Sequence, residues 1–130
     1  MPVAGPVIAV LDDEPEMRKA LRRLLVSQGF RVVEYESGEA LLAALDSHPL
    51  NCLLLDLHMP GVNGFDVLKA LQFQHPSLPV VVLTAHDEPG TADRVRSLGA
   101  CSYLKKPVDK MALFSAIQTA LANCHSTRSH

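Results

Sequence analysis

The sequence lacks several features that would mark a particular class of protein. Its basic residues form no run longer than two, and the net charge is −2 with a pI near 6.3. These values argue against a domain whose main task is to coat nucleic acid. No apolar stretch approaches the roughly 20 residues that a membrane-spanning helix needs. Residues 1–6 carry no basic segment that leads into an apolar one, so they do not resemble a secretory signal.

Cysteine is also scarce. Cys52, Cys101 and Cys124 are an odd number and do not have the spacing of metal ligands. Cys52 and Cys101 lie in apolar runs, where we expect buried free thiols. Together with the absence of targeting and membrane-spanning segments, this predicts a reducing, cytoplasmic setting.

What the sequence does contain is a regular alternation of short apolar runs and segments with helical spacing. The chain has 130 residues, is 48% hydrophobic and 20% charged, and has no internal repeat, as expected for one globular domain. Apolar runs predict five strands, at 7–11, 31–35, 52–55, 79–83 and 101–104. Apolar spacing predicts helices after them, at about 15–28, 38–45, 65–71, 92–98 and 111–121.

This alternation predicts an α/β fold with a doubly wound, five-stranded parallel sheet of the flavodoxin-like type and helices on both faces. We expect one domain over residues 1–124. Residues 125–130 are expected to be a flexible C-terminal tail or the start of a linker.

Polar residues follow four of the five predicted strands. They are Asp12, Asp13 and Glu14 after the first, Asp56 after the third, Thr84 after the fourth, and Lys105 and Lys106 after the fifth. Because the carboxyl ends of parallel strands meet at one edge of a sheet, where ligands bind, we expect these side chains to gather there.

Carboxylates that crowd together raise one another's pKa and need a neutralising cation. Oxygen ligands without cysteine or histidine select a hard ion, namely Mg²⁺, Mn²⁺ or Ca²⁺. Mg²⁺ fits best, with Mn²⁺ as a substitute, because it binds one or two carboxylates and keeps water or phosphate oxygens. A carboxylate such as Asp56 can also attack phosphorus and form an aspartyl phosphate. Lys106 and Thr84 could then stabilise the phosphoryl oxygens.

Each position alone has an ordinary structural explanation. The acids at 12–14 could cap a helix, Asp56 could be a turn residue, Thr84 could cap the next helix, and Lys105 and Lys106 could be a solvated pair. The combination, with every group at a strand end and in this order, favours a site.

The sequence resembles the receiver domains of bacterial two-component response regulators, from Val7 to about Ala122. The residues that carry the resemblance are Asp12, Asp13, Asp56, Met59, Pro60, Gly61, Gly64, Thr84, Ala85, Tyr103, Lys106 and Pro107.

The resemblance implies that Asp56 is the phosphoacceptor. It also implies that Asp13, Asp56 and the backbone carbonyl of His58 bind Mg²⁺ directly, while Asp12 belongs to the same metal site and acts on the ion less directly. Lys106 would contact the phosphoryl group, and Lys105 would take no part in the site. The peptide bond between Lys106 and Pro107 is expected to be cis, which suits a tight turn.

The resemblance further implies a switch. Thr84 would rotate inward to bond a phosphoryl oxygen beside the small Ala85, and Tyr103 would follow it. The surface formed by the fourth helix, fifth strand and fifth helix would then change its packing. An ordinary edge aromatic is the alternative for Tyr103. His58 and His86 depart from the commonest family pattern. They are either exposed loop histidines or side chains whose bulk and titration affect the lifetime of the phosphoryl group.

The expected function is thus a phosphorylation-dependent signalling switch whose donor is a histidine kinase. Such a receiver promotes its own phosphorylation and dephosphorylation but is not a turnover enzyme. Expected partners are the kinase, a second copy joined through the fourth helix and fifth strand after phosphorylation, and a DNA-binding output domain.

Two other functions share some of these features. A haloacid-dehalogenase-type phosphohydrolase also forms an aspartyl phosphate, but its nucleophile lies at the first strand in an Asp-x-Asp pattern, and it often has a cap domain. Here the first strand ends in Asp12-Asp13-Glu14-Pro15, and no residues remain for a cap. A binding-only pseudo-receiver is the other alternative, and the full acidic, Lys and Thr set argues against it.

Overall fold

The computed structural model describes residues 5–59 and 63–124. The predicted tail at 125–130 and two residues of the family motif, Pro60 and Gly61, lie outside the described residues. In the described part, strands and helices alternate in this order: β1 (Val7–Leu11), α1 (Pro15–Ser27), β2 (Arg31–Tyr35), α2 (Gly38–Ala44), β3 (Cys52–Asp56), α3 (Gly64–Gln74), β4 (Val80–Thr84), α4 (Thr91–Ser97), β5 (Ser102–Lys105), α5 (Lys110–Thr119) and a π-helical segment, η1 (Ala120–Cys124).

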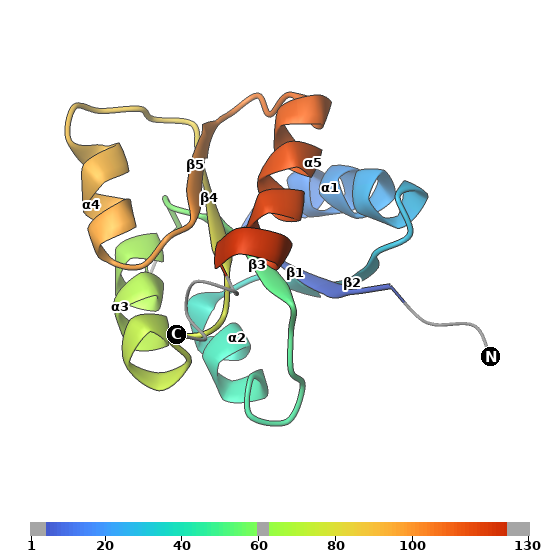
Figure 1. Cartoon of the computed structure of the whole chain (residues 1–130), viewed down its shortest axis with the longest axis horizontal. Coiled ribbons are helices and arrows are strands. Elements are labelled where there is room, and N and C mark those ends of the chain that lie inside the picture. Colours follow the sequence, from blue (N-terminus) through green and yellow to red (C-terminus); the bar gives the residue numbers. More distant parts are fainter. Residues whose placement is uncertain (1–4, 60–62, 125–130) are drawn as a thin grey trace.

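The five strands form one parallel sheet in the order β2-β1-β3-β4-β5 (Figure 1). This confirms the predicted α/β fold. Every residue of β3 and β4 is buried, as expected for central strands that are covered on both faces. The edge strands β2 and β5 are only partly buried.

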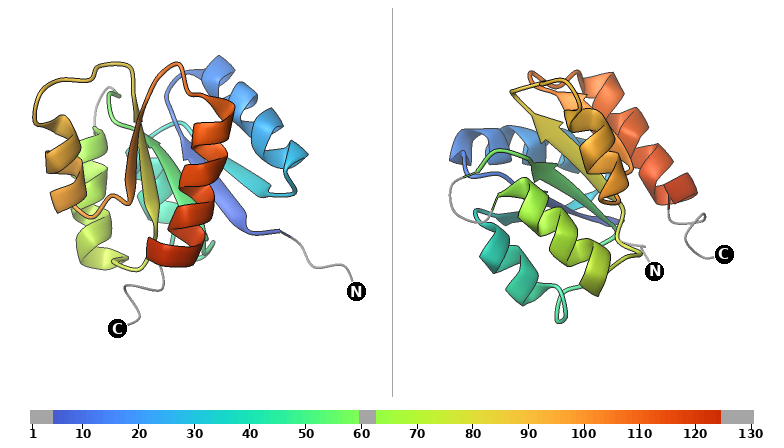
Figure 2. Two further views of the ribbon diagram at one scale, coloured as in Figure 1. Left: turned by 45° about the horizontal axis from the view of Figure 1, so that its top comes forward. Right: turned by 90° about the vertical axis from the view of Figure 1, so that its left-hand side faces the viewer.

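Helices cover both faces of the sheet, with α1 and α5 on one side and α2, α3 and α4 on the other (Figures 1 and 2). Because side chains alternate along a strand, β1 contributes to two separate cores. Ala9 and Leu11 pack in the cluster that contains the buried residues of α2, α3 and α4. Ile8 and Val10 pack in the cluster of α1 and α5.

Local sequence signals set several helix ends. The Ser37 side chain accepts a hydrogen bond from the Ala40 N–H at 3.2 Å and caps α2. Asn63 caps α3 in the same way, from the Asp66 N–H at 3.0 Å. Gly29 follows α1 with φ +90°, a left-handed conformation that glycine adopts without a steric penalty.

The cysteine prediction is half right. Cys52 is a buried free thiol, and burial raises its pKa to about 12. Cys101 is instead half-buried and disulfide-bonded, so the prediction of a free thiol is wrong there. The apolar run at 101–104 leads into the edge strand, which the helices cover less completely than the central strands.

Among the described residues, no helix has both the length and the apolar character needed to cross a lipid bilayer.

Candidate functional site

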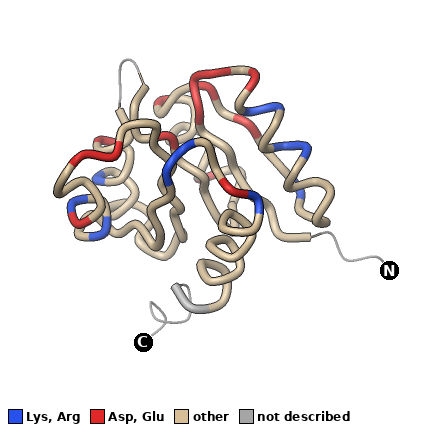
Figure 3. Tube along the Cα trace, turned by 90° about the horizontal axis from the view of Figure 1, so that it is seen from above, with Lys and Arg blue, Asp and Glu red and all other residues tan. Residues whose placement is uncertain are grey.

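The predicted polar residues meet at one edge of the molecule, where the strands end. Strands β1 and β3 are neighbours in the sheet, and Leu11 is paired with Leu55, so the next residues along the two strands, Asp12 and Asp56, emerge side by side. Figure 3 looks onto this edge and shows a Lys or Arg segment between acidic segments. The topology of the sheet, rather than closeness in sequence, therefore builds the site.

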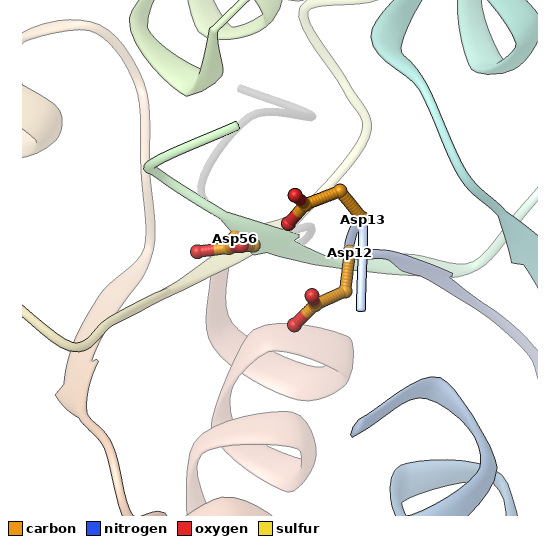
Figure 4. A group of neighbouring side chains, drawn as sticks. All are labelled: Asp12, Asp13 and Asp56. Atoms are coloured by element: carbon orange, nitrogen blue, oxygen red, sulfur yellow. The ribbon is translucent and has the colours of Figure 1, made fainter. Parts of the chain in front are cut away.

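Three carboxylates form the centre of the site. Asp12, Asp13 and Asp56 each offer an oxygen, and these oxygens all lie within 4.8 Å of one another. Figure 4 shows Asp56 at the end of its strand, facing the two acids that follow β1. Asp12 and Asp56 are only 1% and 4% exposed, whereas Asp13 is exposed to solvent. The cluster can thus hold a cation that solvent reaches from one side.

Lys106 brings a positive charge to these acids from the far end of the chain. Its Nζ lies 2.9 Å from Asp12 Oδ2, 3.6 Å from Asp56 Oδ1 and 3.9 Å from Glu14 Oε1. The predicted cis peptide bond between Lys106 and Pro107 is present. Lys105 points elsewhere, with a side chain that is 66% exposed.

The protonation of this cluster reflects burial and charge together. Burial, followed by the negative charge of Asp12, raises the pKa of Asp56 to about 6, against the opposing effects of Lys106 and the His58 N–H. Burial alone would lower the pKa of Lys106, but its hydrogen bond to Asp12 and the charge of Asp56 raise it overall. At neutral pH the site therefore holds an ionised Asp56 beside a protonated lysine.

Asp12 is held by several groups, and the sequence did not predict one of them, Arg18. One carboxylate oxygen accepts the Glu14 N–H at 2.9 Å, and the other accepts from Lys106. Arg18 Nη1 donates to the backbone carbonyl of Asp12 at 2.7 Å, and Arg18 Nε lies 3.4 Å from Glu34. Helical periodicity places Arg18 on α1 but does not indicate which way its long side chain turns, so no sequence signal predicted this contact.

Thr84 is fully buried, and its hydroxyl is engaged with the loop after β4. The hydroxyl accepts the His86 N–H at 3.0 Å and donates to the His86 carbonyl at 3.1 Å. Thr84 does not cap the next helix, because α4 begins at Thr91 with Gly90 before it. The neighbouring Ala85 is exposed.

His58 and His86 contact each other at the rim of the site. Their ring centroids lie 5.1 Å apart and the rings are nearly perpendicular, at 87°. The His58 N–H donates to Asp56 Oδ1 at 3.3 Å. Both residues are exposed, and the contact joins the loops after β3 and β4, which the sequence did not predict.

Tyr103 lies on β5 and is partly buried. Its hydroxyl donates to Asp87 Oδ1 at 2.9 Å, and Lys105 Nζ lies 3.5 Å from Asp87 Oδ2. Asp87 was absent from the predicted site because a single acid in a loop of the sequence carries no pattern.

A cavity of about 450 Å³ lies elsewhere, at the ends of β3 and β4 opposite to the acidic cluster. Its lining includes Pro49, Leu50, Pro76, Leu78 and Leu121, but none of the three clustered aspartates. The acidic cluster is thus separate from this cavity.

Comparison with known proteins gives a consistent result. Residues 8–118 match the family model of the response regulator receiver domain. The chain is 35% identical over 117 residues to the DNA-binding transcriptional regulator NtrC of Salmonella typhimurium, covering 90% of this chain and 25% of that protein. It is 34% identical over 114 residues to the transcriptional regulatory protein FixJ of Bradyrhizobium diazoefficiens, covering 88% of this chain and 56% of that protein.

A solved structure agrees with the sequence matches. A response regulator receiver domain protein from Clostridium thermocellum superposes with a TM-score of 0.84 at 29% identity, covering 89% of this chain and 94% of that one. The chain spans between a quarter and just over half of the length of the two regulators that it matches.

Proposed function

The chain belongs to the response regulator receiver domain family and is a phosphorylation-dependent signalling switch, and we propose that Asp56 is the residue that accepts the phosphoryl group. The observation that carries the proposal is the position of Asp56, which is 4% exposed and whose carboxylate lies close to two further aspartates and to the Lys106 ammonium. Attack by a carboxylate oxygen on phosphorus would form an aspartyl phosphate.

The acidic cluster is proposed to bind Mg²⁺, with Mn²⁺ as a substitute. Its donors are carboxylate oxygens, which suit a hard cation. Asp13 and Asp56 would be ligands together with the backbone carbonyl of His58, while Asp12 would hold Lys106 and the start of α1 in place. When bound, the ion would neutralise the charge that develops on the phosphoryl oxygens.

Lys106 and Thr84 are proposed to contact the phosphoryl group, with Ala85 beside it. The Lys106 ammonium already lies 3.6 Å from Asp56 and can bond a new oxygen there after a small movement. Thr84 would exchange its bonds to His86 for a phosphoryl oxygen. Tyr103 would then change its position, and the surface of α4, β5 and α5 would repack.

The chain is a signalling domain, and we propose that it catalyses its own phosphorylation and dephosphorylation without turning over a separate substrate. The phosphohydrolase alternative has no support among the relatives. The proposed donor is a histidine kinase, and the proposed location is the cytoplasm. Because NtrC is named as a DNA-binding transcriptional regulator and FixJ as a transcriptional regulatory protein, we propose a DNA-binding output domain. We also propose a phosphorylation-dependent dimer through α4 and β5.

The test is labelling with a small phosphodonor. The purified protein is incubated with acetyl phosphate, with Mg²⁺ or with a chelator, and its intact mass is measured. We expect one added phosphoryl group that requires the metal and is absent from the Asp56→Asn variant. Asp66→Asn, which alters an exposed aspartate on α3, is the matched control and should be labelled like the unaltered protein. Labelling that survives in Asp56→Asn would rule out the proposed acceptor.

A further inference from the structure

We propose that Asp87 is a positioning residue of the switch, which ties the loop after β4 to Tyr103 and Lys105 of β5 and so favours the unphosphorylated conformation. The inference rests on the proposed role of Asp56 and extends it to a residue outside the acidic cluster. Asp87 would act through Tyr103 and the loop, without contact to the phosphoryl group.

The contact joins two separate segments. Tyr103 and Lys105 are two residues apart on β5, so their side chains leave the same face of the strand. One oxygen of Asp87 accepts the Tyr103 hydroxyl at 2.9 Å, and the other lies 3.5 Å from the Lys105 ammonium. A single carboxylate therefore joins the loop to the edge strand through one hydrogen bond from a tyrosine and one ion pair with a lysine.

The same loop is connected to the site through Thr84. The Thr84 hydroxyl bonds both the N–H and the carbonyl of His86, which directly precedes Asp87. The hydroxyl has one proton, so it cannot donate to the His86 carbonyl and to a phosphoryl oxygen on Asp56 at the same time. Rotation of Thr84 would thus release the backbone next to Asp87 and weaken its hold on Tyr103. The two arrangements compete, as a two-state switch requires.

The protonation state of Tyr103 fits this role. Burial and the hydrogen bond to Asp87 raise the pKa of Tyr103 to about 12. The phenol therefore remains a hydrogen-bond donor throughout the neutral range. The contact responds to the conformation of the loop rather than to ordinary changes in pH.

Thermodynamic reciprocity gives the expected effect. Where the unphosphorylated conformation dominates, a change that destabilises only that conformation strengthens the binding of a ligand that selects the other one by nearly the same factor. Loss of one charged hydrogen bond at an exposed position corresponds to about a three- to tenfold change in such an equilibrium. Asp87→Ala should therefore lower the Kd for beryllium fluoride, a phosphoryl analogue, by about three- to tenfold in the presence of Mg²⁺.

The experiment combines this Kd with a direct probe of Tyr103. The sequence has two tyrosines and no tryptophan, so in a Tyr35→Phe background Tyr103 is the sole strong fluorophore. Asp87→Ala should change its emission before any analogue is added. Asp87→Asn keeps a hydrogen-bond acceptor but not the charge, and should give an intermediate Kd. Glu88→Ala removes the neighbouring negative charge but leaves the Tyr103 hydrogen bond, and should change neither measurement.

The outcomes separate this inference from the proposed function. If the unaltered protein binds beryllium fluoride and Asp87→Ala binds it with the same Kd, the role of Asp87 is overturned while that of Asp56 stands. An equal effect of Glu88→Ala would also overturn it, because charge alone would then be responsible. If the unaltered protein does not bind the analogue, or Asp56→Asn binds it equally well, the proposed function itself fails and the inference fails with it.

Discussion

Replacing Asp56 with asparagine is expected to stabilise the metal-free protein at neutral pH, although it removes the proposed phosphoacceptor. Asparagine has nearly the same shape as aspartate and carries no charge. The carboxylate of Asp56 is 4% exposed and lies beside Asp12, so its ionisation is costly in the folded state. Such a loss of stability is common at residues that serve a function, and it fits the role proposed for Asp56.

The size of the effect follows from the pKa of Asp56, which is raised from 3.8 to about 6 in the folded protein. Below about pH 4 the group is protonated in both the folded and the unfolded states, and ionisation costs nothing. As the pH rises from about 4 to about 6, only the unfolded state loses the proton, so the free energy of unfolding falls. The full penalty, present above pH 6, is about 3 kcal/mol.

Urea denaturation in the presence of a chelator measures this difference. The free energy of unfolding of Asp56→Asn should exceed that of the unaltered protein by about 1 kcal/mol at pH 4.5 and by about 3 kcal/mol at pH 7.5. Mg²⁺ should stabilise the unaltered protein and have little effect on the variant. The difference in the free energy of unfolding between the two should therefore become smaller when Mg²⁺ is added. Asp13→Asn, at the exposed acid of the same cluster, should give a smaller gain. The reasoning is refuted if Asp56→Asn is no more stable at pH 7.5, or if the gap does not depend on pH.

Three further changes test the structure around the site. Lys106→Met leaves Asp12 with an uncompensated buried charge and should cost about 3 kcal/mol at pH 7 in urea denaturation; a cost below about 1 kcal/mol would contradict the pairing. Gly64→Ala would place a methyl group 2.6 Å from Leu57 Cα, a backbone atom, so a drop in Tm of several degrees is expected in calorimetry, and an unchanged Tm would show that the close packing is absent. Leu113→Ala, at a fully buried position of α5, should cost about 2–5 kcal/mol by the same denaturation assay, whereas exposed Met111→Ala should cost far less.

Much of the fold was predictable because the local signals agree with the global arrangement. The runs at 7–11 and 52–55 are apolar throughout, which is what strands buried on both faces require. The polar residues that interrupt this pattern mark the strand ends, so Asp12 and Asp56 could be assigned to one edge. The end of α1 could be predicted from Gly29, because glycine adopts the left-handed conformation that ends a helix without help from tertiary contacts.

The parts that sequence reasoning missed depend on the directions of long or loop-borne side chains. Arg18 reaches back to the carbonyl of Asp12, and Asp87 receives Tyr103, but neither contact follows from a period or a spacing. The prediction for Cys101 was wrong for a related reason, because a disulfide depends on which cysteines meet in the folded chain, and an apolar run does not show this.

The hydrogen bond between Lys106 and Asp12 joins residues that are 94 positions apart. During synthesis the two aspartates after β1 leave the ribosome long before the lysine that follows β5. A nascent chain, or one that has lost its last strand, therefore carries the acidic cluster without the lysine that lies beside it. If Lys106 contacts the phosphoryl group as proposed, phosphorylation at Asp56 would require the last strand and the residues after it to be in place.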